Sequence, residues 1–392
     1  MRIFAALPVM NEPNVEKTIQ QILTQTQPAT ALYICVNQPE HYKTDPEKKH
    51  IFEQNQETIK NLCRGTKSCA PTQIEIIDKS TTGWNSKHHG VGWARKVLMD
   101  TINEVANPED IIISLDADTE YPPAYFDSVR NIFTPRWGTK FCAPTNPSQY
   151  VPVVALSNPY YHKLTGREPE DRAILRYEIY MRCYHQNLNR IGSPYAFTAL
   201  GSAMAVQVEA YRKIGGIAPK KSGEDFYFLQ QLCKIGKVAT HNSVVVYPET
   251  RLSNRVFFGT GPALIKGVGG DWSSYPIYSP KLWDEIARIY KDFTLYFSPD
   301  DIQKFRTHSK TETQFQKFCH EKFDGLRILQ YLKTRHAQNP QPDEVSLKEN
   351  LEVFGIPITF PSDFSFETAD IMLLDEVRDK LFGFSVRSAC HL

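Results

Sequence analysis

The sequence lacks an excess of charge of either sign. Its 392 residues include 45 lysines and arginines and 44 aspartates and glutamates, which leaves a formal net charge of +1. Proteins that attract nucleic acid or anionic membranes through their overall field carry a large positive charge. The balance argues against such a protein, and we expect no nucleic-acid partner.

Paired cysteines and long apolar runs are missing too. The eight cysteines are scattered singly, with no Cys-x-x-Cys pair and no cysteine–histidine block at zinc spacing, so we expect reduced thiols in a cytosolic protein. No apolar run approaches the roughly 18 residues of a membrane-spanning helix, and the apolar start Ile3–Met10 is too short for a signal-peptide core. We expect a cytoplasmic protein without a transmembrane segment. Peripheral contact with the inner face of a membrane and contact between copies of the chain both stay open.

Strand and helix patterns alternate through the first third of the chain. Short β-branched runs, separated by stretches with apolar residues at helical spacing, predict parallel strands joined by right-handed crossovers. The predicted strands are Ile3–Val9, Ala31–Val36, Ile74–Ile77 and Ile111–Leu115, and the clearest helices are Asn14–Thr26 and Gly90–Val105. The expected fold is α/β, with a central, mostly parallel sheet and flanking helices.

The pattern changes after residue 120. Predicted elements there are helices Ala124–Phe133, Ala173–Leu188 and Glu224–Ile235, with strands Phe141–Ala143 and Ser243–Tyr247. The glycine-containing segment Arg251–Tyr278 reads as a flexible loop, and helix signals dominate after Pro280. We predict one domain over residues 1–275, with halves 1–120 and 121–275, and a mostly helical C-terminal region over residues 276–392.

Two carboxylates follow the fourth predicted strand, in Asp116-Ala-Asp118. Ligands bind at the carboxyl ends of strands in open α/β sheets, so both acids would stand at the mouth of a site. Two acids one residue apart are suited to a hard divalent cation that also holds a diphosphate. An Asp-rich turn without a ligand is the alternative.

Polar residues also follow the first strand, in Pro8-Val-Met-Asn11-Glu12. Asn and Glu at a sheet's carboxyl edge can form hydrogen bonds with a nucleotide base. A simple turn in which Asn11 caps the next helix is the competing interpretation.

Two further motifs stand at predicted helix starts. Gly90-Val-Gly92-Trp-Ala-Arg95 follows a loop that contains Lys87, and its backbone N–H groups and basic side chains suit a phosphate. Gly223-Glu224-Asp225 places two acids where the helix dipole favours them, so a capping pair is one interpretation. A carboxylate that deprotonates a hydroxyl would also sit on such a rigid terminus.

The order of these motifs, with Gly201-Ser202 between the last two, resembles the family-2 glycosyltransferases of GT-A fold over residues 1 to about 260. The resemblance implies an inverting hexosyltransferase-type enzyme of cell-envelope glycan biosynthesis. Such an enzyme moves a sugar from a nucleotide-diphosphate sugar to an acceptor hydroxyl of a glycan, a lipid-linked molecule or a small molecule. The resemblance assigns nucleotide binding to residues 1–120 and acceptor binding to residues 121–275.

The resemblance also implies residue roles on the donor side. Asp116 would lean toward the nucleoside and ligate the metal together with Asp118, the main ligand of Mg²⁺ or Mn²⁺. Arg95 would lie near the donor. Further donor-binding residues would be Pro8, Asn11, Glu12 and Asp78, the last replacing an aspartate that many members carry after the second strand.

On the acceptor side, the resemblance makes Asp225 the general base and Glu224 its helper. Gly201 and Ser202 would face donor sugar and acceptor, while Arg251 and Arg255 would belong to a lid. The family's frequent metal-binding histidine after the Glu-Asp helix is missing, and Glu249 is a candidate replacement.

Two other functions compete with sugar transfer. A nucleotidyltransferase would need a glycine-rich, lysine-containing loop after the first strand, and Leu7–Asn14 contains no glycine. A non-catalytic carbohydrate-binding protein on the same fold would have little use for three acids at one sheet edge.

Overall fold

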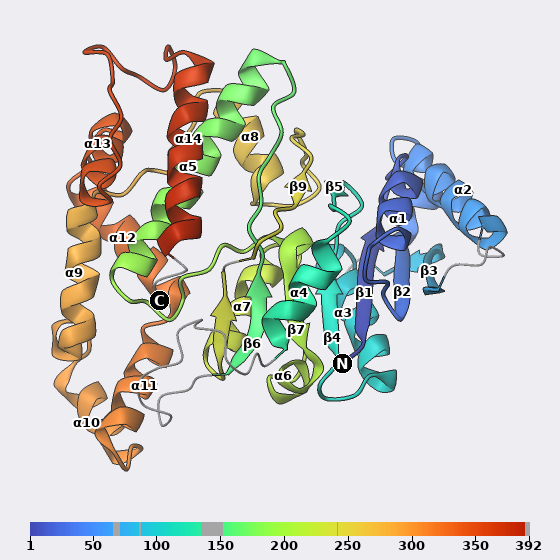
Figure 1. The fold of residues 1–392 in the computed structure, drawn as a ribbon, viewed down its shortest axis with the longest axis horizontal. Coiled ribbons are helices and arrows are strands. Elements are labelled where there is room, and N and C mark those ends of the chain that lie inside the picture. Colours follow the sequence, from blue (N-terminus) through green and yellow to red (C-terminus); the bar gives the residue numbers. More distant parts are fainter. Residues whose placement is uncertain (66–70, 86–87, 135–151, 241, 389–392) are drawn as a thin grey trace. The chain divides into compact units, whose positions relative to one another are not determined.

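A computed structural model describes residues 1–65, 71–85, 88–134, 152–240 and 242–388 of the chain (Figure 1). Its contacts divide into two compact units. The first, here called the sheet unit, comprises Met1–Leu164 and Phe197–Pro262, and the second, the helical unit, comprises Thr165–Ala196 and Ala263–Leu392.

Within the described residues, seven strands of the sheet unit form one sheet in the order β3-β2-β1-β4-β7-β6-β8. Strands β3, β2, β1 and β4 are mutually parallel, whereas β7 is antiparallel to both of its neighbours. The α/β class and the mostly parallel sheet are therefore confirmed. The bounds are β1 Ile3–Val9, β2 Ala31–Pro39, β3 Gln73–Trp84, β4 Ile111–Ser114, β6 Val153–Ser157, β7 Met204–Gln207 and β8 Lys237–Ala239, and a separate pair joins β5 Thr119–Glu120 to β9 Tyr247–Pro248.

The register of the parallel strands brings the predicted motifs to one edge. Ala6 of β1 pairs with Ser114 of β4, so both strands end near one another and the chain after each leaves at the same side. Val36 of β2 pairs with Asp78 of β3 in the same direction. Carboxyl ends of parallel strands are where such sheets bind ligands.

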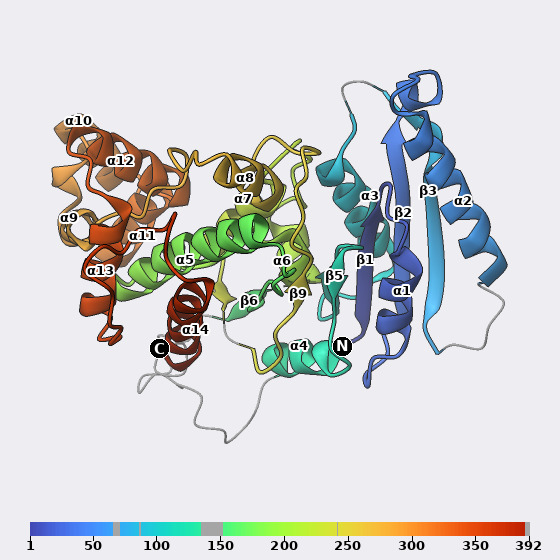
Figure 2. The same ribbon diagram turned by 90° about the horizontal axis from the view of Figure 1, so that it is seen from above.

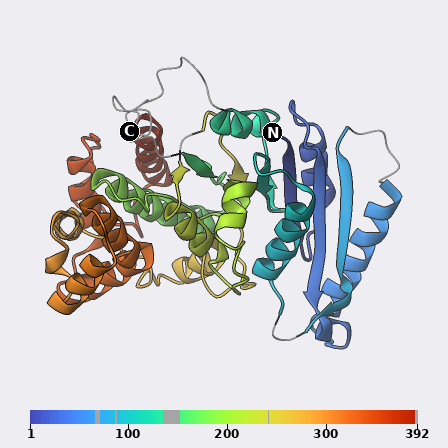
Figure 3. The ribbon, with the colours of Figure 1, turned by 90° about the horizontal axis from the view of Figure 1, so that it is seen from below.

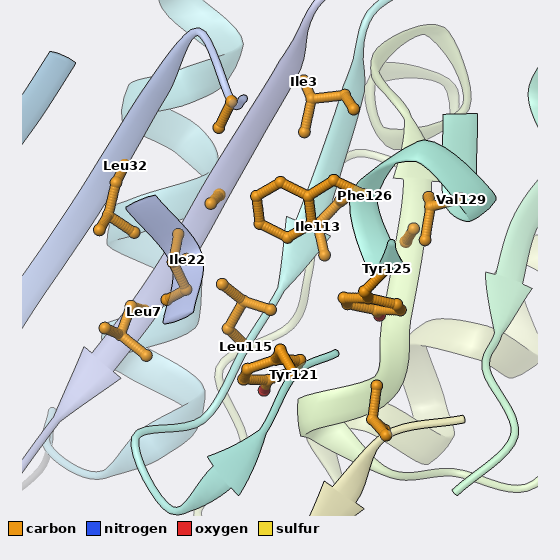
Figure 4. Close-up of a cluster of buried hydrophobic side chains, with 14 of the residues drawn as sticks. Ile3, Leu7, Ile22, Leu32, Ile113, Leu115, Tyr121, Tyr125, Phe126 and Val129 are labelled. Atoms are coloured by element: carbon orange, nitrogen blue, oxygen red, sulfur yellow. The ribbon is translucent and has the colours of Figure 1, made fainter. Parts of the chain in front are cut away.

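One face of the sheet carries the main apolar core (Figure 4). Alternate strand residues such as Leu7, Leu32 and Ile113 point into it, as the period of two requires, and each is fully buried. The helices that supply the other side of this core are α1 Val15–Leu23, α2 Lys49–Gly65 and α4 Tyr125–Phe133.

The intervening strand residues are buried as well, which is expected of parallel strands covered on both faces. Phe4 and Ile112 are at most 2% exposed, and α3 (Val91–Val105) contacts β1, β2 and β4. Helices α6 (Val208–Lys213) and α7 (Glu224–Cys233) contact β7 and β6 respectively. Short 3-10 turns complete this unit at η1 Glu40–Lys43 and η3 Gly201–Ala203.

The helical unit is built around the long helix α5 (Glu168–Arg190), along which α14 (Ile371–Ser388) packs (Figure 2). Arg176 of α5 is fully buried, with its guanidinium between the rings of Trp272 and Phe366 at 5.0 and 4.6 Å. Figure 3 shows the orange helices of residues 280–338 gathered beside α5, which α9 contacts directly. The remaining helices are α8 Thr260–Val268, α9 Pro280–Lys291, η4 Phe293–Leu295, α10 Pro299–Thr307, α11 Glu312–Lys322, α12 Gly325–Gln338 and α13 Asp343–Val353.

Most predicted elements and the helical C-terminal region are present, with some differences. The segment Arg251–Tyr278 is not a loop throughout, because it contains α8. The strand expected at Ser243–Tyr247 is reduced to Tyr247–Pro248. Phe141–Ala143 and Lys87 lie outside the described residues.

The predicted domain boundary at residue 275 stays a prediction. In the contact-based division, the chain passes between the two units after Leu164, after Ala196 and after Pro262, so α5 groups with the C-terminal helices. Within that unit, the buried Tyr180 of α5 packs against Tyr275, with ring centroids 5.6 Å apart. Within the described residues, no helix is both long and apolar enough to cross a membrane.

Truncation of Ile113 tests the core. This side chain is fully buried in β4, so Ile113→Ala should lower the free energy of unfolding by about 2–5 kcal/mol. Val105→Ala, at a position that is 54% exposed, should change it by less than about 0.5 kcal/mol. Chemical denaturation of both variants makes the comparison, and equal losses would contradict the assignment of this face to the core.

Candidate active site

A single buried guanidinium lies at the centre of the sheet's carboxyl edge. Arg95, on the first turns of α3, is only 2% exposed. It donates to the carboxylates of Asp116 at 2.6 Å and Glu224 at 3.1 Å. It also donates to the hydroxyl oxygen of Ser114 at 2.7 Å and to the carbonyl oxygens of Leu115 and Gly201 at 3.3 and 3.1 Å. Burial of a guanidinium is tolerated only with such partners.

This network joins segments that are far apart in the sequence. Ser114 ends β4 and is followed by Leu115 and Asp116, Gly201 begins η3, and Glu224 begins α7. Gly201 has no room for a side chain, because a Cβ there would lie 2.2 Å from Nη2 of Arg95. The glycine is therefore required by the close approach of the guanidinium.

Asp116 is bound on one side and open on the other. Besides Arg95, its backbone N–H donates to the hydroxyl oxygen of Tyr121 at 2.8 Å, and its side chain remains 28% exposed. Burial raises the pKa of Asp116 to about 6, although Arg95 opposes the shift. The fixed carboxylate can still accept a hydrogen bond from a ligand.

The two acids of α7 differ in environment. Glu224 is 4% exposed and faces Arg95, whereas Asp225 is half-buried. Burial raises the pKa of Asp225, while Arg95 and backbone N–H groups, including that of Phe226 at 2.7 Å, act in the opposite direction. Burial raises the pKa of Glu224 as well. A half-open carboxylate of raised pKa suits a general base, and Glu224 suits a positioning role.

Residues 249–258, here called the strap, cross the same edge of the sheet. Arg251 binds the Glu12 carboxylate through both terminal nitrogens, at 3.0 and 2.8 Å, and lies 2.5 Å from Oδ2 of Asp118. Arg255 donates to Glu12 at 2.7 Å and to the carbonyl oxygen of Met10 at 2.8 Å. The strap is thus attached to the chain that follows β1 and to the Asp-x-Asp segment.

The strap also reaches the start of α7. The hydroxyl oxygen of Ser222 accepts from the backbone N–H of Phe257 at 3.0 Å. Gly223 has φ 70°, a left-handed conformation that favours glycine, and a Cβ there would lie 2.6 Å from the ring of Phe258. The strap therefore spans from Glu12, predicted to bind the donor, to the start of α7.

The expected metal site at Asp116 and Asp118 does not fit this arrangement. Carboxylate oxygens are suitable ligands for Mg²⁺ or Mn²⁺. However, Asp116 holds Arg95 and Asp118 holds Arg251, with Arg255 3.9 Å away. No group of three or more His, Cys, Asp or Glu side chains able to hold a metal occurs in the part of the chain that the structure describes. A cation at Asp118 would have to displace a guanidinium.

The other predicted donor residues lie along the same edge, in different environments. Pro8 is buried within β1, paired with Cys35 of β2. Asn11 has φ 54°, a conformation that Asn adopts more readily than most residues, and donates its N–H to Asn55 at 2.8 Å. The helix cap is Asn14 rather than Asn11. Asp78 is exposed on β3 and accepts from Ser80.

A buried amide network next to these residues was missed by the sequence analysis. Asn55 donates to Gln38 Oε1 at 2.7 Å and to the carbonyl oxygen of Asn37 at 3.3 Å, and Asn37 donates to the carbonyl oxygen of Val9 at 3.0 Å. All three amides are at most 3% exposed. They join the ends of β1 and β2 to α2. Asn37 and Gln38 directly follow the predicted strand Ala31–Val36, which marks them as candidates for the sheet edge. Asn55 lies in a polar helix without a motif, so the sequence did not indicate its role.

Gly201 and Ser202 were predicted to face donor sugar and acceptor, but both are buried. Their carbonyl oxygens accept from Arg95 and from Tyr121, the latter at 3.1 Å. Gly92, whose motif is predicted to suit a phosphate, lies against the backbone of Lys220, where a Cβ would be 2.1 Å from the carbonyl oxygen. These residues hold the site together. Tyr121 had no motif to reveal it.

No family model matches the chain, and no curated protein matches it. Among solved structures it is similar to the mannosyltransferase PcManGT from Pyrobaculum calidifontis in complex with GDP-Man and Mn²⁺. That match has 14% identity and a TM-score of 0.36, and it covers 99% of this chain and 86% of that one. It is also similar to a mycobacterial protein, with 13% identity and a TM-score of 0.35 over 64% of this chain and 65% of that one.

Removal of the Arg95 guanidinium tests the network. Arg95→Met leaves Glu224 and Asp116 without their cation, so the free energy of unfolding should fall by about 3–5 kcal/mol. Arg64→Met on exposed α2 should change it by no more than about 0.5 kcal/mol. Denaturant titration measures both, and a loss at Arg95 as small as the control would show that the network does not stabilise the sheet edge.

Proposed function

We propose that the chain is an inverting glycosyltransferase that moves a sugar from a nucleotide-diphosphate sugar to an acceptor hydroxyl by single displacement. The observation that carries the proposal is the Arg95 network, in which one guanidinium binds Asp116 and Glu224 and attracts the charge of Asp225. This arrangement supports the assignment of one carboxylate to the nucleoside and another to the acceptor.

Asp225 is the general base in this proposal. Its carboxylate takes the proton from the acceptor hydroxyl as that oxygen attacks the anomeric carbon, the bond to the diphosphate breaks, and the nucleoside diphosphate leaves with the electron pair. Its raised pKa and half-open position support this role, since a base is most effective with a pKa near the working pH. Backbone N–H groups, including that of Phe226 at 2.7 Å, hold its carboxylate in place, and Arg95 attracts its charge.

Asp116 receives the nucleoside in this proposal, next to the chain after β1 that bears Asn11 and Glu12. Pro8 and Asp78 complete the donor side at β1 and β3. No Mg²⁺ or Mn²⁺ takes part in this proposal, because the Asp118 carboxylate, where the metal was expected, contacts a guanidinium at 2.5 Å. The acceptor is a hydroxyl of a glycan, a lipid-linked molecule or a small molecule, met in the cytoplasm or at the inner face of the membrane.

Replacement of the base separates binding from chemistry. Asp225→Asn keeps the size of the side chain and removes its basicity, so transfer should fall by about 10²–10⁴-fold while nucleoside-diphosphate binding changes little. Asp127→Asn on the exposed face of α4 is the matched control. Assays of donor turnover and calorimetric binding make the test. Full activity of Asp225→Asn would move the base elsewhere, and binding without turnover in the unmodified chain would favour a non-catalytic protein.

The pH profile gives a second test of the same residue. Burial raises the pKa of Asp225 above its ordinary value of 3.8, against the opposing effect of Arg95. The base works only when ionised, so kcat/KM should rise with pH through a midpoint above 3.8 and fall away below it. An acid limb with a midpoint at or below 3.8, measured with the nucleotide sugar well under its KM, would contradict Asp225 as a base of raised pKa.

A further inference from the structure

The strap brings cationic side chains to the place where the Asp-x-Asp motif was expected to hold a metal. Arg251 contacts Asp118 at 2.5 Å and binds Glu12 through two nitrogens. Arg255 binds Glu12 at 2.7 Å and lies 3.9 Å from Asp118. The two carboxylates that face the donor side are therefore matched by two permanent positive charges.

Both guanidinium groups remain accessible. Their side chains are 28% and 31% exposed, whereas that of Glu12 is 10% exposed. Asp118, at 23% exposed, is nearly as accessible as the arginines, and Glu12 lies deeper. A guanidinium has five N–H donors in a planar fork, so a cation held by one carboxylate can still donate to phosphate oxygens on its free side.

We propose that Arg251 and Arg255 bind the diphosphate of the donor and take the place of a divalent cation at Asp118. This inference rests on the proposed function and concerns the charge that the same site uses. Asp118 and Glu12 orient the guanidinium groups, and each guanidinium bridges a carboxylate and a phosphate oxygen, as a metal ion would. The charge on the departing nucleoside diphosphate is then balanced by fixed cations of the chain.

The attachment of the strap supports this role. Ser222 accepts from Phe257 at 3.0 Å, directly before the start of α7. A segment attached at both Glu12 and Ser222 keeps its arginines close to α7, the helix that bears Asp225. Preorganised cations of this kind need little rearrangement when the donor binds.

Calorimetric titration of the full chain with GDP and with UDP, in EDTA and in Mn²⁺, tests the inference. We expect binding of one nucleotide in EDTA, with an affinity that Mn²⁺ changes by less than about threefold. Arg251→Ala/Arg255→Ala should weaken that binding by about tenfold or more, because hydrogen bonds between charged partners are lost. Arg64→Ala, which removes one positive charge from an exposed position of α2, should leave it unchanged.

Other outcomes separate this inference from the proposed function. Nucleotide binding that requires Mn²⁺ and is lost in Asp118→Asn would overturn the inference and leave the transferase proposal standing. Binding in EDTA that the double variant does not weaken would also overturn it. Binding of neither nucleotide under either condition would overturn both proposals. If the double variant does not fold, Arg255→Lys takes its place, because it keeps the charge but loses the planar fork of N–H donors. Nucleotide binding in EDTA should then be weakened by less than tenfold. Unchanged affinity of Arg255→Lys in EDTA would count against the inference.

Discussion

The buried ion pairs of Arg95 are the interaction on which the rest of the site depends. One guanidinium, 2% exposed, satisfies Asp116 at the end of β4, Glu224 at the start of α7 and the carbonyl oxygen of Gly201 between them. Without a cation at this point, the two carboxylates would repel each other in a region with little water. The same constraint explains why residue 201 is a glycine, because a side chain there would occupy the space that the guanidinium fills.

A second electrostatic layer lies outside the first. Glu12 pairs with Arg251 and Arg255, and Asp118 pairs with Arg251. The inner pairs are rigid because α3, β4 and α7 hold them, whereas the outer pairs come from the strap, which has no regular secondary structure between β9 and α8. The proposed chemistry divides in the same way. The inner layer positions the base, and the outer layer supplies charge for the diphosphate.

Local pattern and motif order were enough to predict the parallel sheet and the placement of Asp116, Asp118 and Asp225 at one edge. Short β-branched runs are a local signal, and strand ends follow from them. The partners of these residues depend on tertiary contacts. Arg95 was expected near the donor, but its burial was not predicted, because it follows from the packing of α3 on β1. Asn55 and Tyr121 had no motif at all. The arginines of the strap were visible, but their pairing with Glu12 spans more than 200 residues of sequence, which no local pattern reveals.

The stereochemistry of donor hydrolysis tests the account most directly. With α-linked nucleoside-diphosphate hexoses and no acceptor, water takes the place of the acceptor hydroxyl, and proton NMR can identify the first anomer formed before mutarotation. A single displacement assisted by Asp225 predicts that the β anomer appears first, and that Asp225→Asn abolishes its formation. The α anomer as the first product would require a different mechanism and would contradict the central claim.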